Sequence, residues 1–164
     1  MEKRIVYFPS PGVDNTDAAL RLAKERAGEL GLKTVVLAST RGFTAEKALE
    51  ALEGFKLVVV GIERERFSRE TAAKLKEKGL PVVFSREVSY RYPEEMKTAF
   101  RRLSQGVKVA VEDAVIACQA GFVEPGMDVV SIAGSSRGAD TAIVINAAWD
   151  FPSVKVKEII CMPR

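Results

Sequence analysis

Two short loops in the sequence combine glycine, hydroxyl side chains and a single arginine. The first loop spans residues 39–44 and the second spans residues 134–141. Each follows an apolar run that is typical of a buried strand, at 35–37 and 129–132. Glycine lets the backbone approach an anion, hydroxyl and backbone N–H groups donate hydrogen bonds to it, and arginine adds charge in a forked geometry. These loops therefore predict a site for a phosphorylated small molecule, and they leave open whether a reaction follows.

A third loop, residues 9–16, follows the first strand-like run and ends at a predicted helix N-terminus. In an open parallel sheet, ligands bind beyond the carboxyl ends of the strands, and helix N-termini carry partial positive charge. Because the same residue types are common caps and turn residues, a purely structural role for each loop is the alternative. The expected ligand-binding residues are Gly12, Asn15, Thr16, Ser39, Thr40, Gly42, Thr44, Gly134, Ser135, Ser136, Arg137, Gly138, Asp140 and Thr141.

The sequence gives weaker indications of catalytic or metal-binding residues. The chain has no histidine, which excludes Ser-His-Asp and Cys-His systems and imidazole ligands to zinc. No clustered carboxylate motif indicates a metal site, and no catalytic residue is identified. Glu112 and Asp113 lie within an apolar run and have two interpretations. They face solvent or backbone groups at a helix edge, or one is a buried carboxylate with a raised pKa that can act as a general base.

Composition indicates an ordinary globular protein. A length of 164 residues predicts a single domain spanning 1–164, with 47% hydrophobic and 29% charged residues. The net charge of +3 is too small to indicate binding to nucleic acid or to a membrane surface, and no apolar run is long enough to span a bilayer. Cys118 and Cys161 lie far apart in apolar surroundings. We expect buried free thiols in the reducing cytoplasm.

Strand-like and helix-like segments alternate along the chain. Continuous Val/Ile/Leu runs favour parallel strands covered on both faces. The sequence predicts a three-layer α/β fold with a mostly parallel sheet, helices on both faces and an antiparallel edge strand. The expected strands are 4–8, 34–38, 57–60, 81–84, 128–133, 142–146 and 156–162. The expected helices are 15–30, 44–52 capped by Thr44, a helix capped by Ser68 and ending at Lys78, a helical region from Tyr92-Pro93 to about Leu103, and a largely buried helix 107–120.

These segments resemble the C-terminal α/β domain of pyruvate kinase. The run 34–45 is similar to the strand and loop that hold an effector phosphate in that domain. The run 128–138 is similar to the strand and loop that close over the same effector, and 156–162 resembles its edge strand, which also joins subunits. A closer resemblance is to stand-alone archaeal proteins of this type, which have no catalytic barrel. It is carried by 11–12, 15–16, 103–112, 138–142 and 158–164.

The resemblance implies a cytoplasmic homo-oligomer that holds FMN or another phosphorylated compound and has no pyruvate kinase activity. It implies that residues 39–44 hold the phosphate and that 135–137 close over it. Asp140 and Thr141 would contact a ribityl or sugar hydroxyl. The segment 61–93 departs from the longer relatives, which carry an extra loop after the third strand.

Three classes of function fit these observations. The first is a binding or sensor module, and the second is a flavin-dependent or other small-molecule enzyme that uses Glu112 or Asp140. The third is an assembly protein that uses its last strand to form oligomers. A bound chromophore would separate the first two classes from the third, and turnover of a reductant would separate the enzyme from the sensor.

Overall fold

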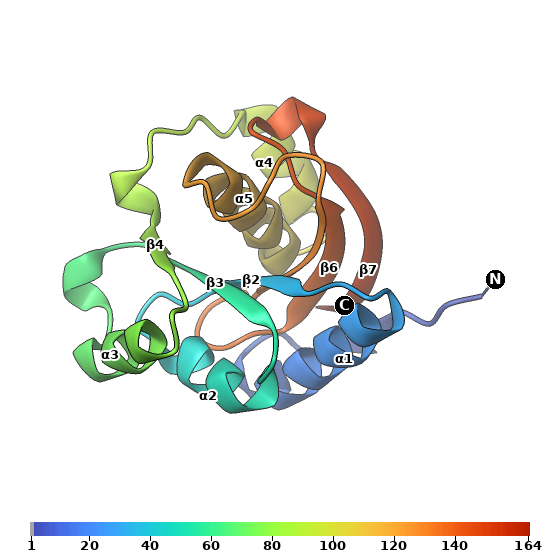
Figure 1. The fold of residues 1–164 in the computed structure, drawn as a ribbon. Coiled ribbons are helices and arrows are strands. Elements are labelled where there is room, and N and C mark those ends of the chain that lie inside the picture. Colours follow the sequence, from blue (N-terminus) through green and yellow to red (C-terminus); the bar gives the residue numbers. More distant parts are fainter. Residues whose placement is uncertain (1) are drawn as a thin grey trace.

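The computed structural model describes residues 2–164, which form a seven-stranded sheet with helices on both faces (Figure 1). The strand order is β1-β7-β6-β5-β2-β3-β4. The strands are β1 (Val6–Phe8), β2 (Thr34–Ala38), β3 (Lys56–Gly61), β4 (Val82–Phe84), β5 (Asp128–Ala133), β6 (Thr141–Asn146) and β7 (Lys155–Pro163). The helices are α1 (Thr16–Glu29), α2 (Phe43–Ala51), α3 (Arg69–Glu77), α4 (Glu94–Arg101) and α5 (Gln105–Gln119).

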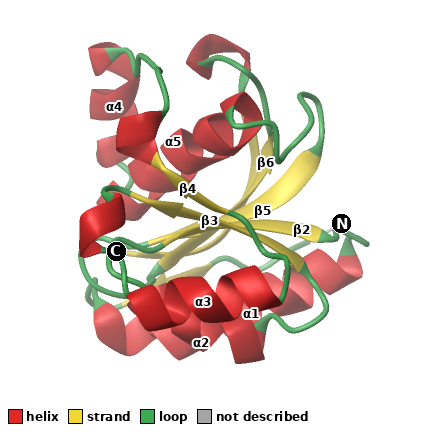
Figure 2. Ribbon diagram, turned by 60° about the vertical axis from the view of Figure 1, so that its left-hand side comes forward, coloured by secondary structure: helices red, strands yellow, loops and turns green. Residues whose placement is uncertain are grey.

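The predicted three-layer α/β fold is confirmed. Helices α1, α2 and α3 cover one face of the sheet, and α4 and α5 cover the other (Figure 2). All strands run parallel to one another except β6, which is antiparallel to both of its neighbours. The sheet is therefore covered on both sides, as its continuous apolar strands require.

One topological detail differs from the prediction. The antiparallel strand β6 lies inside the sheet, and the last strand, β7, is not the outermost strand. Strand β1 closes that side by pairing in parallel with the end of β7, from Val6 opposite Cys161 to Phe8 opposite Pro163. The predicted edge strand is thus covered over its last three residues, because a pairing between the two ends of the chain leaves no local sequence signal.

Helix α5 is a core element, as its apolar sequence predicted. Eleven of its fifteen residues are buried, so the helix packs into the protein rather than lying on its surface. It begins after Ser104, whose Oγ accepts a hydrogen bond from the Val107 N–H at 3.0 Å. This cap fixes the direction in which the first turn of α5 leaves the preceding loop.

Helix α2 starts differently from its prediction. The predicted cap, Thr44, lies inside the helix, and Gly42 takes the cap position with a φ of 101°. A left-handed φ of this kind favours glycine, and the helix starts two residues earlier than a cap at Thr44 would place it. Ser39 Oγ accepts the Ala45 N–H at 3.2 Å. The Ser68 cap of α3 is confirmed, because its Oγ accepts the Thr71 N–H at 3.2 Å.

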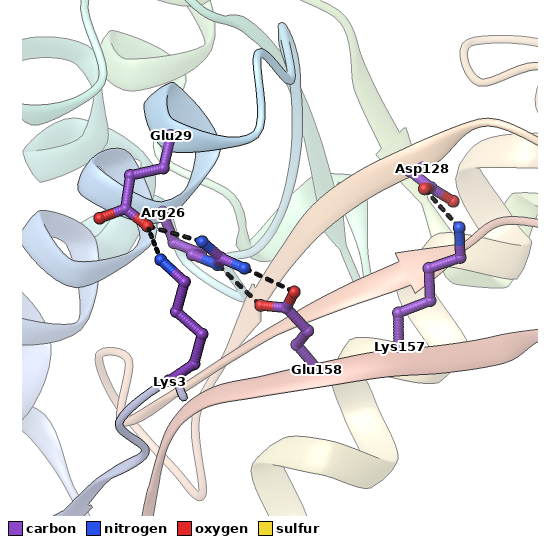
Figure 3. A network of polar contacts seen from close by, with 6 residues as sticks. All are labelled: Lys3, Arg26, Glu29, Asp128, Lys157 and Glu158. Atoms are coloured by element: carbon purple, nitrogen blue, oxygen red, sulfur yellow. Dashed lines mark hydrogen bonds and ion pairs between the residues drawn. The ribbon is translucent and has the colours of Figure 1, made fainter. Parts of the chain in front are cut away.

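A chain of ion pairs joins the N-terminal segment, α1 and β7 (Figure 3). Arg26 binds both carboxylate oxygens of Glu158, at 2.7 and 2.6 Å, and Glu29 at 2.6 Å. Lys3 reaches Glu29 at 2.9 Å. The two-pronged contact with Arg26 lowers the pKa of the Glu158 carboxyl. It fixes the end of α1 against β7.

The two thiols are buried and free, as predicted. Burial raises the pKa of Cys118 to about 11 and that of Cys161 to about 12. Neither thiol is therefore an activated nucleophile. Among residues 2–164, no helix is both long enough and apolar enough to cross a membrane.

Candidate functional site

A cavity of about 760 Å³ lies at the carboxyl edge of the parallel strands. It is lined by the loops that follow β2, β3, β4 and β5, together with one face of α5. Strands β2 and β5 are neighbours, and the sheet extends from them in opposite directions, through β3 on one side and β6 on the other. This is the topological switch point at which open α/β sheets bind ligands.

The loops after β2 and β5 make one side of the cavity electropositive. Arg41 and Arg137 both line it, and among residues 2–164 neither forms an ion pair with a carboxylate. The Arg137 guanidinium carbon lies over the Phe43 ring, 4.2 Å from its centroid, and this cation–π contact stabilises the position of the cation. The N-terminus of α2 lies at the same cavity, since Phe43 and Thr44 line it, and the first N–H groups of a helix have no partner within the helix. This side is suited to an anion.

Eight of the predicted ligand-binding residues lie together around this cavity. They are Ser39, Thr40, Thr44, Gly134, Ser135, Ser136, Arg137 and Gly138. Gly42 is not part of the lining, and it sets the start of α2 instead. The structure thus brings the two predicted loops together, although they are almost a hundred residues apart in the sequence.

The loop after β1, residues 9–16, does not line the cavity, contrary to expectation. Asn15 Nδ2 donates to the Ser10 carbonyl at 2.8 Å, within the loop itself. Thr16 Oγ1 donates to the Val13 carbonyl at 2.6 Å and accepts the Ala139 N–H at 3.1 Å. These side chains are engaged by backbone groups, so this loop braces the loop after β5 rather than facing the cavity.

Asp140 and Thr141 are also placed differently from the prediction. Both are fully buried and absent from the cavity wall. Asp140 Oδ2 accepts the N–H groups of Gly12 at 3.0 Å and Ser135 at 3.2 Å, and its Oδ1 accepts the Thr141 hydroxyl at 2.8 Å. A contact between these side chains and a sugar hydroxyl has no support in this arrangement. Their hydrogen bonds connect the loop after β1 with the loop after β5, and we call Asp140, Thr141 and these bonds the joint beneath the loop after β5.

The start of α5 packs directly on this joint. A Cβ added at Gly106 would lie 2.1 Å from Thr141 Oγ1 and 3.0 Å from Asp140 Oδ1. Gly134 meets a similar restriction, since an added Cβ would lie 2.4 Å from the Gly138 carbonyl oxygen. Glycine at both positions allows close backbone approach. The joint therefore fixes the loop after β5 relative to α5.

Of the α5 face, the sequence indicated only Glu112 and Asp113, as a possible general base, and the other residues of this face were missed. Its cavity-lining residues are Gln105, Lys108, Val109, Glu112 and Asp113. They recur at intervals of three and four, so they form one stripe along the helix. Polar residues at this spacing inside an otherwise apolar helix are the sequence signal that could have identified them.

Three members of this stripe form a polar cluster with Tyr90. Lys108 pairs with Glu112, and the Tyr90 hydroxyl donates to the other Glu112 oxygen at 2.8 Å. Asp113 is only 5% exposed, and its Oδ2 has no hydrogen-bond partner among the described residues. Burial, and then the neighbouring Glu112 charge, raise the pKa of the Asp113 carboxyl well above its usual range, and Lys108 partly opposes this. Of the two interpretations of this pair, the buried carboxylate is correct for Asp113.

The segment 61–93 completes the cavity wall. Its contribution consists of Gly61, Ile62, Ser85, Arg86 and Tyr90. Arg86 pairs with Glu63, and burial raises the pKa of the Tyr90 hydroxyl above its usual range. Within residues 2–164, no group of three or more His, Cys, Asp and Glu side chains is arranged to hold a metal ion. The cavity therefore has an electropositive side, a polar cluster on α5 and no recognisable metal centre in the described part.

Comparisons with known proteins agree with this architecture. Residues 17–145 match the profile of the family described as "Pyruvate kinase, alpha/beta domain". A crystal structure of a pyruvate kinase from Cryptosporidium parvum is similar with a TM-score of 0.52 and 14% identity, over 83% of this chain and 23% of that one. A second, of Cryptosporidium parvum pyruvate kinase in complex with ADP, has a TM-score of 0.48 and 16% identity, over 91% of this chain and 24% of that one.

The chain spans about a quarter of the length of these two enzymes. At 14% identity, the first similarity shows the shared fold alone. The family profile covers most of the chain, from the start of α1 to the end of β6. This chain therefore belongs to the pyruvate kinase alpha/beta domain family.

Proposed function

We propose that this chain binds a phosphorylated small molecule in the cavity between the loops after β2 and β5, as a binding module without pyruvate kinase activity. The observation that carries the proposal is the pair of arginines, Arg41 and Arg137, which face the cavity without a carboxylate partner in residues 2–164. A phosphate would supply the missing negative charge.

The backbone around the arginines supports this assignment. The N-terminal N–H groups of α2 and the hydroxyls of Thr40, Thr44, Ser135 and Ser136 surround the same side of the cavity. Helix N-termini and hydroxyl donors bind phosphate oxygens without needing a metal ion. The phosphate would sit over the start of α2, with Arg137 closing over it from the loop after β5.

FMN is the first ligand to test, because the stand-alone proteins that the sequence resembles are expected to bind it. The cavity volume lies within the ordinary range for small-molecule sites, and the residues present fit an elongated phosphate ester. The arginines would hold its phosphate, and Ala38, Val60, Ile62 and Val109 offer an apolar wall to a ring. Bound FMN would supply a ring system that can accept and return electrons.

The contacts that the cavity offers favour binding as the role of this site. They are anion contacts on one side and a paired Lys108–Glu112 cluster on α5. A binding module needs no further group, because the arginines and hydroxyls can hold a phosphate by themselves.

The first experiment is the absorption spectrum of the purified protein, followed by mass spectrometry of compounds released on denaturation. Flavin absorption with an FMN mass would identify the ligand directly. Titration calorimetry with FMN and with glycerol 3-phosphate then follows, on the wild type and on the double variant Ser39→Ala/Thr44→Ala. We expect affinity to fall about tenfold or more in the double variant, since two donors are lost.

Exposed Thr98 on α4 provides the matched control, because Thr98→Ala removes a hydroxyl away from the cavity. Melting curves check that the fold of each variant is retained, since Ser39 also caps α2. Equal affinity in the double variant and the control would overturn the assignment of the phosphate position. Absence of binding of any phosphorylated compound to the wild type would overturn the proposed function.

A further inference from the structure

Asp113 is a buried polar group that the phosphate-binding loops do not use. It lies on the cavity-facing stripe of α5, is only 5% exposed, and has one carboxyl oxygen without a partner in the described chain. Burying an unpaired polar atom is costly, so almost all such atoms in folded proteins have a partner. Asp113 therefore brings to the cavity wall a carboxyl group whose hydrogen bonding the described chain does not complete, and a ligand atom there would give this group a partner.

The charges near Asp113 restrict what that ligand atom can be. Lys108, the nearest cation on α5, is already paired with Glu112, and Tyr90 donates to Glu112 as well. The cluster thus lacks a free cation that would hold Asp113 in its charged form. Burial and the Glu112 charge both raise the pKa of the Asp113 carboxyl. In its acid form, the Asp113 carboxyl has an O–H donor, which a carboxylate lacks, and it keeps acceptor capacity on its oxygens.

We propose that Asp113 recognises the end of the ligand opposite its phosphate, by donating a hydrogen bond from its neutral carboxyl to a ring carbonyl or ring nitrogen of an uncharged heterocycle. This inference rests on the proposed function and extends it from a phosphate site to a site for nucleotide-like compounds. The cavity then has two recognition ends, a cationic one at Arg41 and Arg137 and a neutral one at Asp113.

The lining of the cavity favours a ring over a linear sugar phosphate. Besides the two polar ends, the wall contains the apolar side chains of Ala38, Val60, Ile62 and Val109, together with the polar side chains of Ser85, Arg86 and Gln105. A sugar chain carries a hydroxyl on nearly every carbon, and hydroxyls placed against the apolar part of the wall would lose their contacts with water. A flat heterocycle places its polar atoms at its rim and its apolar faces against the aliphatic side chains.

The test compares Asp113→Asn with Asp113→Leu. Asparagine keeps a donor of the same shape without a charge, whereas leucine removes the donor. The test compounds are FMN, UMP and GMP, the corresponding unphosphorylated compounds riboflavin, uridine and guanosine, and glycerol 3-phosphate. For the ring-bearing compound that binds the wild type most tightly, we expect the Asn variant to stay within about threefold and the Leu variant to weaken by about tenfold or more.

Glycerol 3-phosphate is the internal control, because it has a phosphate and no ring. Its affinity should be equal in all three proteins, which would show that the phosphate end is intact. If the Leu variant fails to fold, as judged from its melting curve, Asp113→Ala replaces it. The infrared carbonyl band of the bound ring gives a second measurement, because a donated hydrogen bond lowers its frequency in the wild type and the Asn variant only.

Three results would overturn the inference. Unchanged ring affinity in the Leu or Ala variant would show that Asp113 makes no contact. Equal losses in the Asn and Leu variants would show that a charged Asp113 is required. Failure of every ring-bearing compound to bind, with glycerol 3-phosphate binding retained, would reject the heterocycle and leave the phosphate site standing. Failure of glycerol 3-phosphate alone would instead count against the proposed phosphate site.

Discussion

Asp140 and Asp113 are both buried aspartates, and their surroundings are opposite. Asp140 accepts hydrogen bonds from two backbone N–H groups and from the Thr141 hydroxyl, which leaves it saturated within the protein. Asp113 has an oxygen with no partner in the described residues, and it lies at the cavity wall. Burial of a carboxylate therefore does not by itself indicate function. Whether its hydrogen bonds are satisfied inside the chain separates a structural joint from a recognition group.

Removal of the Asp140 side chain is the strongest test of its structural role. Asp140→Ala leaves the N–H groups of Gly12 and Ser135 without their acceptor in a partly buried setting. We expect the free energy of unfolding to fall by about 3–5 kcal/mol, as for loss of a buried, hydrogen-bonded charged group. Chemical denaturation measures the change.

Asp150→Ala is the matched control for Asp140. The Asp150 carboxylate accepts a single N–H, from Ser153 at 2.9 Å, and it is exposed. Its loss should reduce stability by about 1 kcal/mol or less. If the two variants lose equal stability, the description of Asp140 as a structural joint is wrong.

A second change tests how tightly α5 packs on the same joint. In Gly106→Ala, the new Cβ would lie 2.1 Å from Thr141 Oγ1, so either the hydroxyl or the helix must move. Overpacking of this kind typically costs about 1–3 kcal/mol. Gly28→Ala in α1 is the control, because nothing lies within 4 Å of its added Cβ. The control should be neutral or slightly stabilising, by up to about 1 kcal/mol, and a similar loss in both variants would contradict the close contact.

Removal of an arginine from the cationic side of the cavity should weaken ligand binding and leave stability almost unchanged, and its effect is intermediate in size. Arg137→Gln removes a charge that has no carboxylate partner in the described chain, so the melting temperature should hardly change. The dissociation constant for FMN should rise about tenfold. Arg21→Gln on the exposed side of α1 is the control, and calorimetry that finds the same affinity in both variants would remove Arg137 from the site.

The smallest expected effect is on the pH dependence of the free energy of unfolding, to which the Asp113 carboxyl contributes. Burial raises the pKa of the Asp113 carboxyl in the folded protein well above its usual range, so the unfolded chain releases this proton first as the pH rises. The native state of the wild type therefore loses stability relative to Asp113→Asn from about pH 4 upward, until the folded carboxyl also ionises. Melting curves between about pH 4 and pH 8 should show a difference in melting temperature between the wild type and Asp113→Asn that widens with pH. A difference that narrows would mean that the native state prefers the charged form.

Much of the fold could be predicted from local patterns. Strand β5 was predicted with its observed bounds, and the buried character of α5 followed from its apolar sequence. The cap of α2 was assigned to Thr44, because a hydroxyl residue before an apolar run is the usual signal. The observed turn depends on the left-handed backbone of Gly42, which the local composition did not distinguish.

The candidate site was predictable only in part, for a different reason. Ser39 and Arg137 lie in loops with the composition of anion sites, and the structure places both at the cavity. Gly12 and Thr16 have the same composition, yet their partners are Asp140 and Ala139, more than 120 residues away. Such pairings depend on which strands become neighbours, and no local spacing reveals them.

The pairing of β1 with β7 has a consequence for synthesis of the chain. Strand β1 precedes its partner in the sheet, β7, by 155 residues, from Val6 to Cys161. Domains fold as they emerge, at a rate set by translation, and contacts between distant segments form slowly. Residues 6–8 must therefore wait, with unpaired backbone groups, until residues 161–163 have emerged. The emergence of β7 is the step that allows this side of the sheet to close.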